Sequence, residues 1–481
     1  MAVQEHPVPS PASGEPPAGA PVTDREPASF RDPANQVFYA DGQVLRGLRG
    51  QAVADWQALA ATRFFSQLVA EGKLCPTEPV ADDHGYELTL RHERVPFVSY
   101  PYEWTFSMLR DAARLHLEIL DTALGERMTL KDGSAYNLQW RGAAPMFIDI
   151  GSFEQLREGE PWAGYRQFCQ TMLFPLMLTA HTGAEFQPWL RARIDGIEAG
   201  TMRQLLGGGR RFKAGVFKHV WLQDAISQRM AGTSSRQISQ EMREAGFSTE
   251  LVRATVRALR KLVDKLDWRP PASHWQDYRT TCTYSEEDRQ AKLAFVDAVL
   301  AGSASQRLVL DLGANDGAYS RVAAQHAEYV VAVESDHAVT DTLYQHLRQE
   351  GERRILPLVM DLADPSPGIG WRGRERAPFA ARCQADTVLA LALVHHLAIG
   401  RNVPLAEVRD MLAELGRAVV VEFVDPEDPM AQRLLANKPA GLFPDYRREV
   451  FEQLLAERFT ITRRQELPSG TRVLYAGVPR E

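Results

Sequence analysis

Residues 308–320 read LVLDLGANDGAYS, and they decide the fold of the second half of the chain. The apolar run at the start predicts a buried strand, and two glycines follow where that strand would turn into a helix. Gly313 and Gly317 let the backbone bend sharply and approach a ligand closely, because neither carries a side chain. The stretch therefore predicts a ligand-binding turn at the carboxyl end of a strand.

Apolar runs alternate with helical patterns on the carboxyl side of this turn. Such an alternation is typical of a parallel sheet that helices cover on both faces, so the fold class expected for this half is α/β. The last two runs are closely spaced and predict an antiparallel pair at the edge. The expected strands are residues 308–313, 330–335, 355–362, 387–394, 418–424, 461–468 and 471–478.

Three acids mark the ends of the first three expected strands. Asp311 precedes the glycine turn, Glu334 ends the second strand and Asp361 ends the third. Because the carboxyl ends of parallel strands meet at one edge, we expect these acids to form a site for a positively charged adenosine compound. Asp311 would face a cationic amine, Glu334 the ribose hydroxyls and Asp361 the adenine amine. The alternative is that each acid caps a helix or shapes a loop.

On these residues, the second half resembles the class I S-adenosylmethionine-dependent methyltransferases. DLGANDG is similar to their first motif, and LALALVHHL at 389–397 is similar to their fourth-strand segment. The resemblance covers about residues 285–481 and implies a Rossmann-like fold, S-adenosylmethionine as the cofactor, and methyl transfer to an acceptor. The implied cofactor-binding residues are Asp311, Gly313, Ala314, Asn315, Gly317, Glu334, Asp361 and Leu362.

Two histidines follow the fourth expected strand, where an acceptor should approach. A general base is needed only when the acceptor must lose a proton, and His395 or His396 is a candidate for that role. Alternatively, one imidazole packs in the core and the other binds a backbone carbonyl. Glu422 and Asp425, after the fifth strand, are open to the same two interpretations.

The first half of the chain carries a different pattern. Asp132 and Asn137 are five residues apart, and Asp149 follows Asn137 by twelve. This spacing resembles the catalytic loop and the metal-binding Asp of protein kinases and aminoglycoside phosphotransferases. The preceding order of a hairpin with Asp41 and Gly42 at its turn, a helix, strands and a long helix is similar to a kinase N-lobe. The resemblance implies an α+β domain of kinase type with a candidate nucleotide site.

The first half also departs from the kinase pattern. The glycine-rich loop is reduced to Gly42, Arg46 stands where a lysine is expected, and Leu130 replaces the catalytic histidine. Without the lysine, the nucleotide phosphates lose a contact that aligns them. We therefore expect a degenerate, kinase-like scaffold used for binding. The alternatives are an active kinase, or a chance arrangement in which Asp132 and Asn137 only shape a turn.

Composition limits the partners and the compartment. The 481 residues carry a net charge of -7, which disfavours a nucleic-acid partner, and no apolar run approaches the length of a membrane span. Four single cysteines without a CxxC pair argue against a metal site or a disulfide framework, so a cytoplasmic protein is expected. The expected organisation is a disordered tail (1–35), the kinase-like domain (36–267), a linker (268–288) and the methyltransferase domain (289–481).

Together these patterns predict an enzyme that methylates a small-molecule acceptor, with the first half contributing to substrate recognition. Two alternatives stay open, namely a regulatory protein that binds S-adenosylmethionine without turnover and a bifunctional kinase-methyltransferase. Residues 36–481 as a whole also resemble a bacterial group of two-domain proteins that join a kinase-like domain to a class I methyltransferase domain. That resemblance implies no particular substrate.

Overall fold

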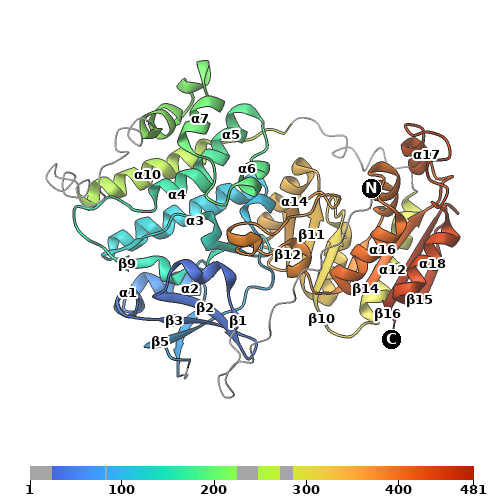
Figure 1. Ribbon diagram of the computed structural model, residues 1–481, viewed down its shortest axis with the longest axis horizontal. Helices are drawn as coiled ribbons and strands as arrows, with labels where there is room; N and C mark the ends of the chain where they lie inside the picture. The colour runs from blue at the N-terminus through green and yellow to red at the C-terminus, as the bar shows by residue number, and fades with distance from the viewer. Residues whose placement is uncertain (1–23, 82–83, 225–247, 271–284, 481) are drawn as a thin grey trace, which may run out of the picture. The chain divides into compact units, whose positions relative to one another are not determined.

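The computed structural model describes residues 24–81, 84–224, 248–270 and 285–480 (Figure 1). The chain forms two compact units, one of Met1–Val53 with Thr77–Arg94 and the other of Ala54–Pro76 with Val95–Glu481. This division does not fall at the expected linker, because the second unit holds most of the first half together with the whole C-terminal sheet. Most of the expected tail and most of the linker lie outside the described residues.

The first unit is built on a five-stranded antiparallel sheet in the order β1-β2-β3-β5-β4. Its strands are β1 (Asp24–Arg25), β2 (Asn35–Ala40), β3 (Gln43–Leu48), β4 (Thr77–Val80) and β5 (Leu88–His92). The predicted hairpin is present, and Asp41 and Gly42 at its turn have φ of 49° and 74°. The expected tail is too long, since β1 pairs with β2 and residues 27–31 form a 3-10 helix.

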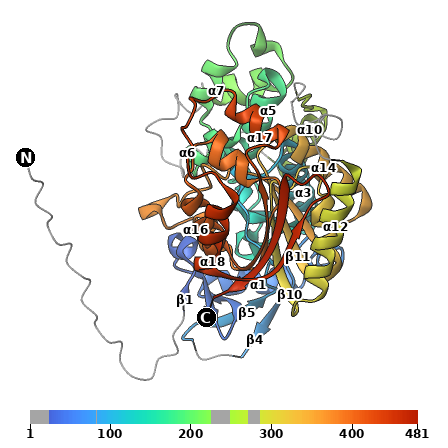
Figure 2. The same cartoon turned by 90° about the vertical axis from the view of Figure 1, so that its right-hand side faces the viewer.

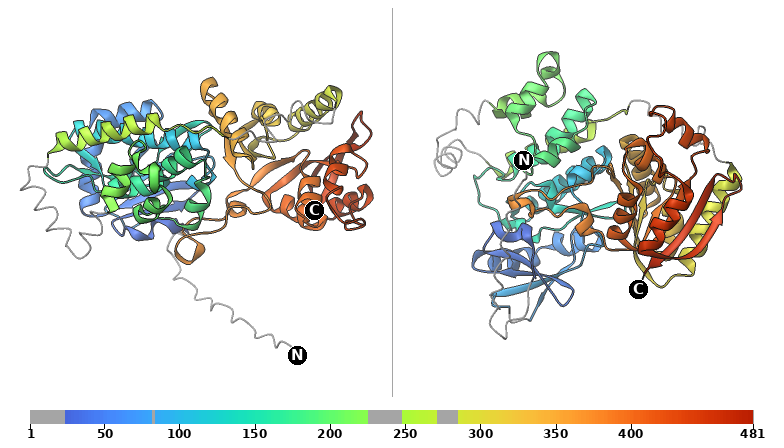
Figure 3. Two further views of the ribbon diagram at one scale, coloured as in Figure 1. Left: turned by 90° about the horizontal axis from the view of Figure 1, so that it is seen from above. Right: turned by 45° about the vertical axis from the view of Figure 1, so that its right-hand side comes forward.

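The remaining part of the first half is largely helical, as its sequence indicates. The sequence of residues 51–74 predicts a single helix, but the chain forms two, because the Thr62 hydroxyl accepts the Phe65 N–H at 3.3 Å and starts the second one. α3 (Phe106–Gly125) confirms the predicted long helix, and it lies beside α10 (Thr249–Lys265), as Figure 3 shows. The other helices are α1 (Gln51–Ala60), α2 (Arg63–Ala70), α4 (Tyr165–Phe168), α5 (Phe174–Thr182), α6 (Gln187–Ala192) and α7 (Ala199–Leu205).

Two short strand pairs surround the kinase-like sequence pattern. β6 (Met128–Leu130) pairs with β9 (Phe153–Gln155), and β7 (Leu138–Arg141) pairs with β8 (Ala144–Phe147). The Ile148 N–H donates to the Asn137 carbonyl at 2.8 Å, and the Lys131 N–H donates to the Ser152 carbonyl at 2.9 Å. These bonds bring the backbone segments that carry Asp132, Asn137 and Asp149 together.

The C-terminal sheet has seven strands in the order β12-β11-β10-β13-β14-β16-β15. Strands β10 to β14 pair in parallel, whereas β16 is antiparallel to both of its neighbours. All seven predicted strands and the predicted antiparallel pair are therefore confirmed. Their bounds are β10 (Gln306–Leu312), β11 (Ala327–Glu334), β12 (Ile355–Val359), β13 (Ala385–Ala390), β14 (Gly416–Val424), β15 (Phe459–Glu466) and β16 (Arg472–Pro479).

Helices cover both faces of this sheet, which explains why its central strands are apolar on both sides (Figure 2). The Ser285 hydroxyl accepts the Asp288 N–H at 3.1 Å and caps α12, as the serine followed by three acids predicts. One face carries α12 (Glu286–Ala301), α13 (Ala318–His326) and α14 (His337–Glu350), and the other carries α16 (Leu405–Leu415) and α18 (Arg448–Arg458). Two shorter helices are α15 (Phe379–Arg382) and α17 (Pro429–Leu435).

Buried polar contacts join α3 to α14 within the second unit. The Ser107 N–H and hydroxyl donate to the Asp341 carboxylate at 2.8 and 2.9 Å. The Tyr344 hydroxyl and the Arg348 guanidinium both bind Asp111, at 2.7 and 2.8 Å. A buried carboxylate is stable only with such partners, so these two helices fix each other. None of the helices in the described ranges is long and apolar enough to cross a membrane.

Candidate functional site

The turn after β10 depends on left-handed backbone conformations. Gly313, Asn315 and Gly317 have φ of 74°, 47° and 77°, a region that glycine and asparagine adopt most readily. The N–H groups of Gly313 and Ala314 both donate to the Val333 carbonyl, at 2.8 and 3.0 Å. A Cβ at Gly317 would lie 2.7 Å from the Leu343 side chain, so the turn has no room for a larger residue there.

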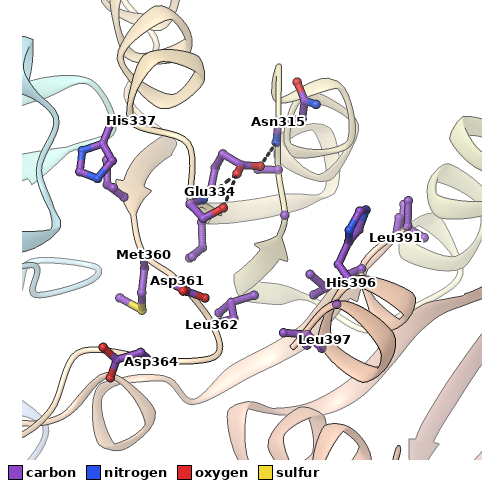
Figure 4. Close-up of a pocket in the computed structure, with 18 of the residues that line it drawn as sticks. Asn315, Glu334, His337, Met360, Asp361, Leu362, Asp364, Leu391, His396 and Leu397 are labelled. Carbon is purple, nitrogen blue, oxygen red and sulfur yellow. Dashed lines mark hydrogen bonds between the residues drawn. The ribbon is translucent and has the colours of Figure 1, made fainter. Parts of the chain in front are cut away.

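Glu334, at the end of β11, ties this turn to the next strand. Its Oε2 accepts the Asn315 N–H at 3.1 Å, as Figure 4 shows. Its Oε1 accepts the N–H groups of Ser335 and Asp336 at 2.6 and 3.0 Å, and also the Ser335 hydroxyl at 3.1 Å. Because a carboxylate offers about four acceptor positions, Oε2 keeps room for a ligand hydroxyl beside its single protein donor.

Asp361 and Leu362 follow β12 on the same rim as Glu334. The Ala363 N–H donates to Asp361 Oδ1 at 2.9 Å, which shapes the turn, and the Arg401 guanidinium pairs with the other carboxylate oxygen. The Asp361 side chain stays 37% exposed, so its carboxylate is accessible to a ligand. Glu334 and Asp361 therefore face one site, as the sequence predicts.

Asp311 does not take the position that its sequence suggests. Its side chain is buried, it does not line the cavity, and it accepts the Ser320 hydroxyl at 2.5 Å. Burial raises the pKa of this carboxyl to about 6. The expectation that Asp311 meets a cationic amine is therefore corrected, because the side chain points under the turn and holds the start of α13.

A cavity of about 1390 Å³ opens above this rim. Seven of the predicted site residues line it, namely Gly313, Ala314, Asn315, Glu334, Asp361, Leu362 and His396, whereas Asp311, Gly317 and His395 do not. Pockets for one small ligand are typically about 300–1,000 Å³, so this cavity has room for a cofactor and an acceptor together. The part-exposed acids and the open glycine turn fit a nucleoside that carries a positive charge.

The two histidines have different environments. His396 lies at the cavity, on the opposite side from His337 and Asp364 in the view of Figure 4. Burial, and then the charge of Arg472, lower the pKa of His396 to about 4, so its ring is uncharged at neutral pH. His395 is 1% exposed and packs in the core, where burial holds its pKa well below the usual range. His395 is therefore the imidazole that packs in the core, and His396 is the remaining candidate for the general base.

Glu422 supports the cavity wall from beneath. Its buried carboxylate accepts the Ala392 N–H at 2.8 Å and pairs with Lys292 at 2.7 Å and with Arg472 at 3.2 Å. Ala392 has a φ of 49°, which is unusual for a residue with a side chain, and this bond helps to hold it there. Asp425 instead binds Arg448 through both carboxylate oxygens.

The sequence gives no sign of Lys292, although this residue lines the cavity. It lies on α12 and its side chain is fully buried, where burial lowers its pKa. Its partner Glu422 is 130 residues away in the chain, and no local pattern connects the two. Asp288 and Lys292 lie four residues apart on α12 and are both buried, but the sequence shows only their spacing and not their burial.

The residues of the kinase-like pattern are only partly explained. Arg46, expected to replace the nucleotide-binding lysine, donates to the Asn35 side chain at 2.7 Å and to His92 at 3.0 Å within its own sheet. The Asn137 Nδ2 has no hydrogen-bond partner within the described ranges, and Asp132 binds the Ser152 hydroxyl through its N–H at 3.2 Å. The kinase-like assignment therefore stays a prediction.

The order of the seven strands, with acids at the carboxyl edge of the sheet, is that of the class I S-adenosylmethionine-dependent methyltransferase fold. The whole chain is 32% identical over 468 residues to nodulation protein NoeA of Rhizobium meliloti (strain 1021), and the match covers 95% of this chain and 97% of that protein. The chain belongs to the NoeA family. No family model matches it.

Solved structures resemble the chain over less than half of its length. The N-methyltransferase NodS from Bradyrhizobium japonicum WM9 is 12% identical, with a TM-score of 0.31, over 41% of this chain and 99% of that chain. The magnesium protoporphyrin IX methyltransferase ChlM from Synechocystis PCC 6803 with bound SAH is 19% identical, with a TM-score of 0.30, over 43% and 94%. At these TM-scores neither likeness bears on activity or substrate.

We expect Glu422→Gln to lower the free energy of unfolding by about 3–5 kcal/mol, because buried Lys292 loses the carboxylate that pairs with it and Arg472 keeps only Asp428. Urea unfolding followed by circular dichroism measures this change. Arg193→Ala is the control, since its pair with Glu198 is more than half exposed on both sides and should contribute less than about 1 kcal/mol. Equal, small losses in the two variants would contradict the role given to Glu422.

Proposed function

We propose that the protein transfers the methyl group of S-adenosylmethionine to a small-molecule acceptor, and that its first half contributes to substrate recognition. The observation that carries this proposal is the meeting of the Gly313–Asn315 turn, Glu334 and Asp361 at one cavity. These groups come from three neighbouring strands, and each faces the place where the fold binds its ligand.

The residues at the carboxyl edge of the sheet contact different parts of the cofactor. The open backbone of the Gly313–Asn315 turn admits a ligand closely, Glu334 Oε2 accepts a ribose hydroxyl, and Asp361 accepts the adenine amine. For Asp361 to do so, Arg401 shares or releases its carboxylate. S-adenosylmethionine, when bound, supplies an electrophilic methyl group with a positive charge beside it, which suits a rim of acids.

The other side of the cavity suits the acceptor. Leu391, Leu393 and Leu397 give it an apolar wall, and His396 beside them is a group that can take a proton. Because the His396 ring is uncharged at neutral pH, it can accept a proton from an acceptor hydroxyl or amine without first losing one. Much of the rate would come from positioning the two reactants in one enclosed space.

The first test is binding of S-adenosylmethionine by isothermal titration calorimetry. We expect the parent protein to bind, and Glu334→Ala and Asp311→Ala to weaken binding at least tenfold, or about 1.4 kcal/mol. Glu334 would lose a direct contact, whereas Asp311 would act through the turn that its bond to Ser320 supports. Glu328→Ala, an exposed acid at the other end of β11, is the matched control. Parent-like binding by both variants would refute the assigned pocket.

The second test is transfer of labelled methyl groups from S-adenosylmethionine into extracts of the source organism, followed by mass identification of the product. We expect His396→Gln to lower the transfer rate by roughly a hundredfold while cofactor binding is kept. Since the His396 pKa is about 4, lowering the pH from 8 to 6 should not protonate this base or slow the step it serves. Binding without any transfer would instead favour the regulatory alternative.

For the first half we propose a kinase-like scaffold that binds without phosphoryl transfer. Support comes from the grouping of the Asp132, Asn137 and Asp149 segments by backbone hydrogen bonds. Arg46 is engaged by Asn35 and His92, so it is not available to align nucleotide phosphates as a strand lysine does.

A phosphate-release assay with ATP and Mg²⁺ separates this scaffold from the bifunctional alternative. We expect no release by the parent and unchanged S-adenosylmethionine binding by Asp149→Ala, because Asp149 lies outside the cavity. Release that Asp149→Ala abolishes would show the bifunctional enzyme.

A further inference from the structure

One wall of the cavity comes from the first half of the sequence. Five of its residues lie on or just before α6, namely Glu185, Gln187, Pro188, Arg191 and Ala192, and Tyr102 lies in a 3-10 turn (Pro101–Glu103) that packs against α6. The Gln187 side-chain amide donates to the Trp104 carbonyl at 2.8 Å, which fixes α6 to the segment after that turn. These residues are about 120 or more positions from the glycine turn, so no sequence motif links them to the cofactor site.

Arg191 holds the turn that carries Asp361. Its guanidinium donates to both carboxylate oxygens of Asp364, at 2.8 and 3.0 Å, and to the carbonyls of Asp364 and Pro365, at 3.1 and 3.0 Å. The Asp364 N–H in turn donates to the Asp361 carbonyl at 3.0 Å. A planar guanidinium with four acceptors has a defined orientation, so Arg191 fixes this turn more firmly than a single charge contact would.

Glu185 makes a second link, to the loop that follows Glu334. Its carboxylate lies 3.4 Å from His337 Nε2, at the first residue of α14. Asp336, one residue earlier, caps that helix by accepting the N–H groups of Ala338 and Val339 at 2.9 and 3.0 Å. The loop of Asp361 is therefore held by α6, and the loop of Glu334 is in contact with a residue two positions before that helix. In Figure 4, His337 and Asp364 lie on the same side of the pocket, next to Glu334 and Asp361.

The same wall carries buried oxygen atoms without a protein partner. The Tyr102 hydroxyl and Gln187 Oε1 take part in no hydrogen bond among the residues that the structure describes, and the two residues are only 4% and 8% exposed. Buried polar atoms in folded proteins are nearly always paired, and an unpaired one needs a separate explanation. Both residues line the cavity, but these two atoms lie beneath its surface, so a polar ligand would supply the partner only after their side chains turn toward it.

We propose that α6 and Tyr102 form a second wall of the cofactor site, at its nucleoside end, so that the first half of the chain takes part in binding the cofactor and not only the acceptor. Arg191 is a positioning residue in this wall, acting through Asp364 on the turn of Asp361. The inference rests on the proposed function, because it assumes an adenosine compound at Glu334 and Asp361.

The test measures the affinity of the full chain for S-adenosylhomocysteine and for 5′-methylthioadenosine, which keeps the nucleoside and lacks the amino acid part. We expect Arg191→Ala to weaken both ligands by the same factor, about threefold to tenfold, in line with the loss of a partly exposed bidentate pair. Arg191→Lys, which keeps the positive charge beside Asp364 but loses the bidentate fork, should bind both ligands with an affinity between those of the parent and Arg191→Ala. Arg193→Ala is the control, because Arg193 lies two residues further along the chain and pairs with Glu198 at an exposed site.

The possible outcomes distinguish a failure of this inference from a failure of the proposed function. If the parent binds neither ligand, the proposed function fails. If the parent binds and Glu334→Ala weakens binding, but Arg191→Ala changes it by less than twofold, only the inference is overturned. A loss for S-adenosylhomocysteine that methylthioadenosine does not share also overturns it, because Arg191 would then act away from the nucleoside. A loss that Arg191→Lys does not reduce overturns it too, because the charge of Arg191 would then play no part in holding the turn.

Discussion

The site depends on one carboxylate, that of Glu334, which accepts hydrogen bonds from two separate turns at once. Three of its four protein donors belong to the residues after its own strand, and the fourth is the Asn315 N–H in the turn after β10. A charged acceptor makes stronger hydrogen bonds than a neutral one, so the two turns are held at a fixed separation. The spacing of the glycine turn and the second strand end, on which any ligand contact relies, follows from this single group.

Several charged side chains around the cavity are buried, and their burial lowers the stability of the folded state. Asp311 is buried beneath the turn with a raised pKa, so its ionised form is disfavoured in the folded state and stability falls as pH rises through about 6. Lys292 and Glu422 are both fully buried and balance each other. Such pairs rarely improve on an apolar core, and they are better understood as fixing the geometry of a turn such as that at Ala392.

Much of the C-terminal half could be predicted from the sequence. Buried parallel strands appear in a sequence as apolar runs, and residues at the carboxyl ends of such strands lie along one edge of the sheet. The glycine turn, Glu334, Asp361 and the seven strands follow from those two rules. The direction of the Asp311 side chain does not follow from these rules. The side chain is buried because the Ser320 hydroxyl of α13 donates a hydrogen bond to it beneath the turn. Contacts such as Arg191 with Asp364 or Lys292 with Glu422 join residues far apart in the chain without any shared pattern. The kinase-like spacing identified a real grouping of backbone segments, but spacing alone cannot say whether the side chains act.

The buried contacts between α3 and α14 have a consequence for how this family can change over time. Asp111 and Asp341 lie on different helices, and each is paired across the boundary between the two halves of the gene. A substitution of either aspartate leaves its buried hydrogen-bond partners on the other helix unpaired. Substitutions that persist should therefore occur together with a matching substitution on the facing helix. The two halves are therefore expected to be inherited as one unit, and recombination that exchanges only one of them would bring mismatched helices together.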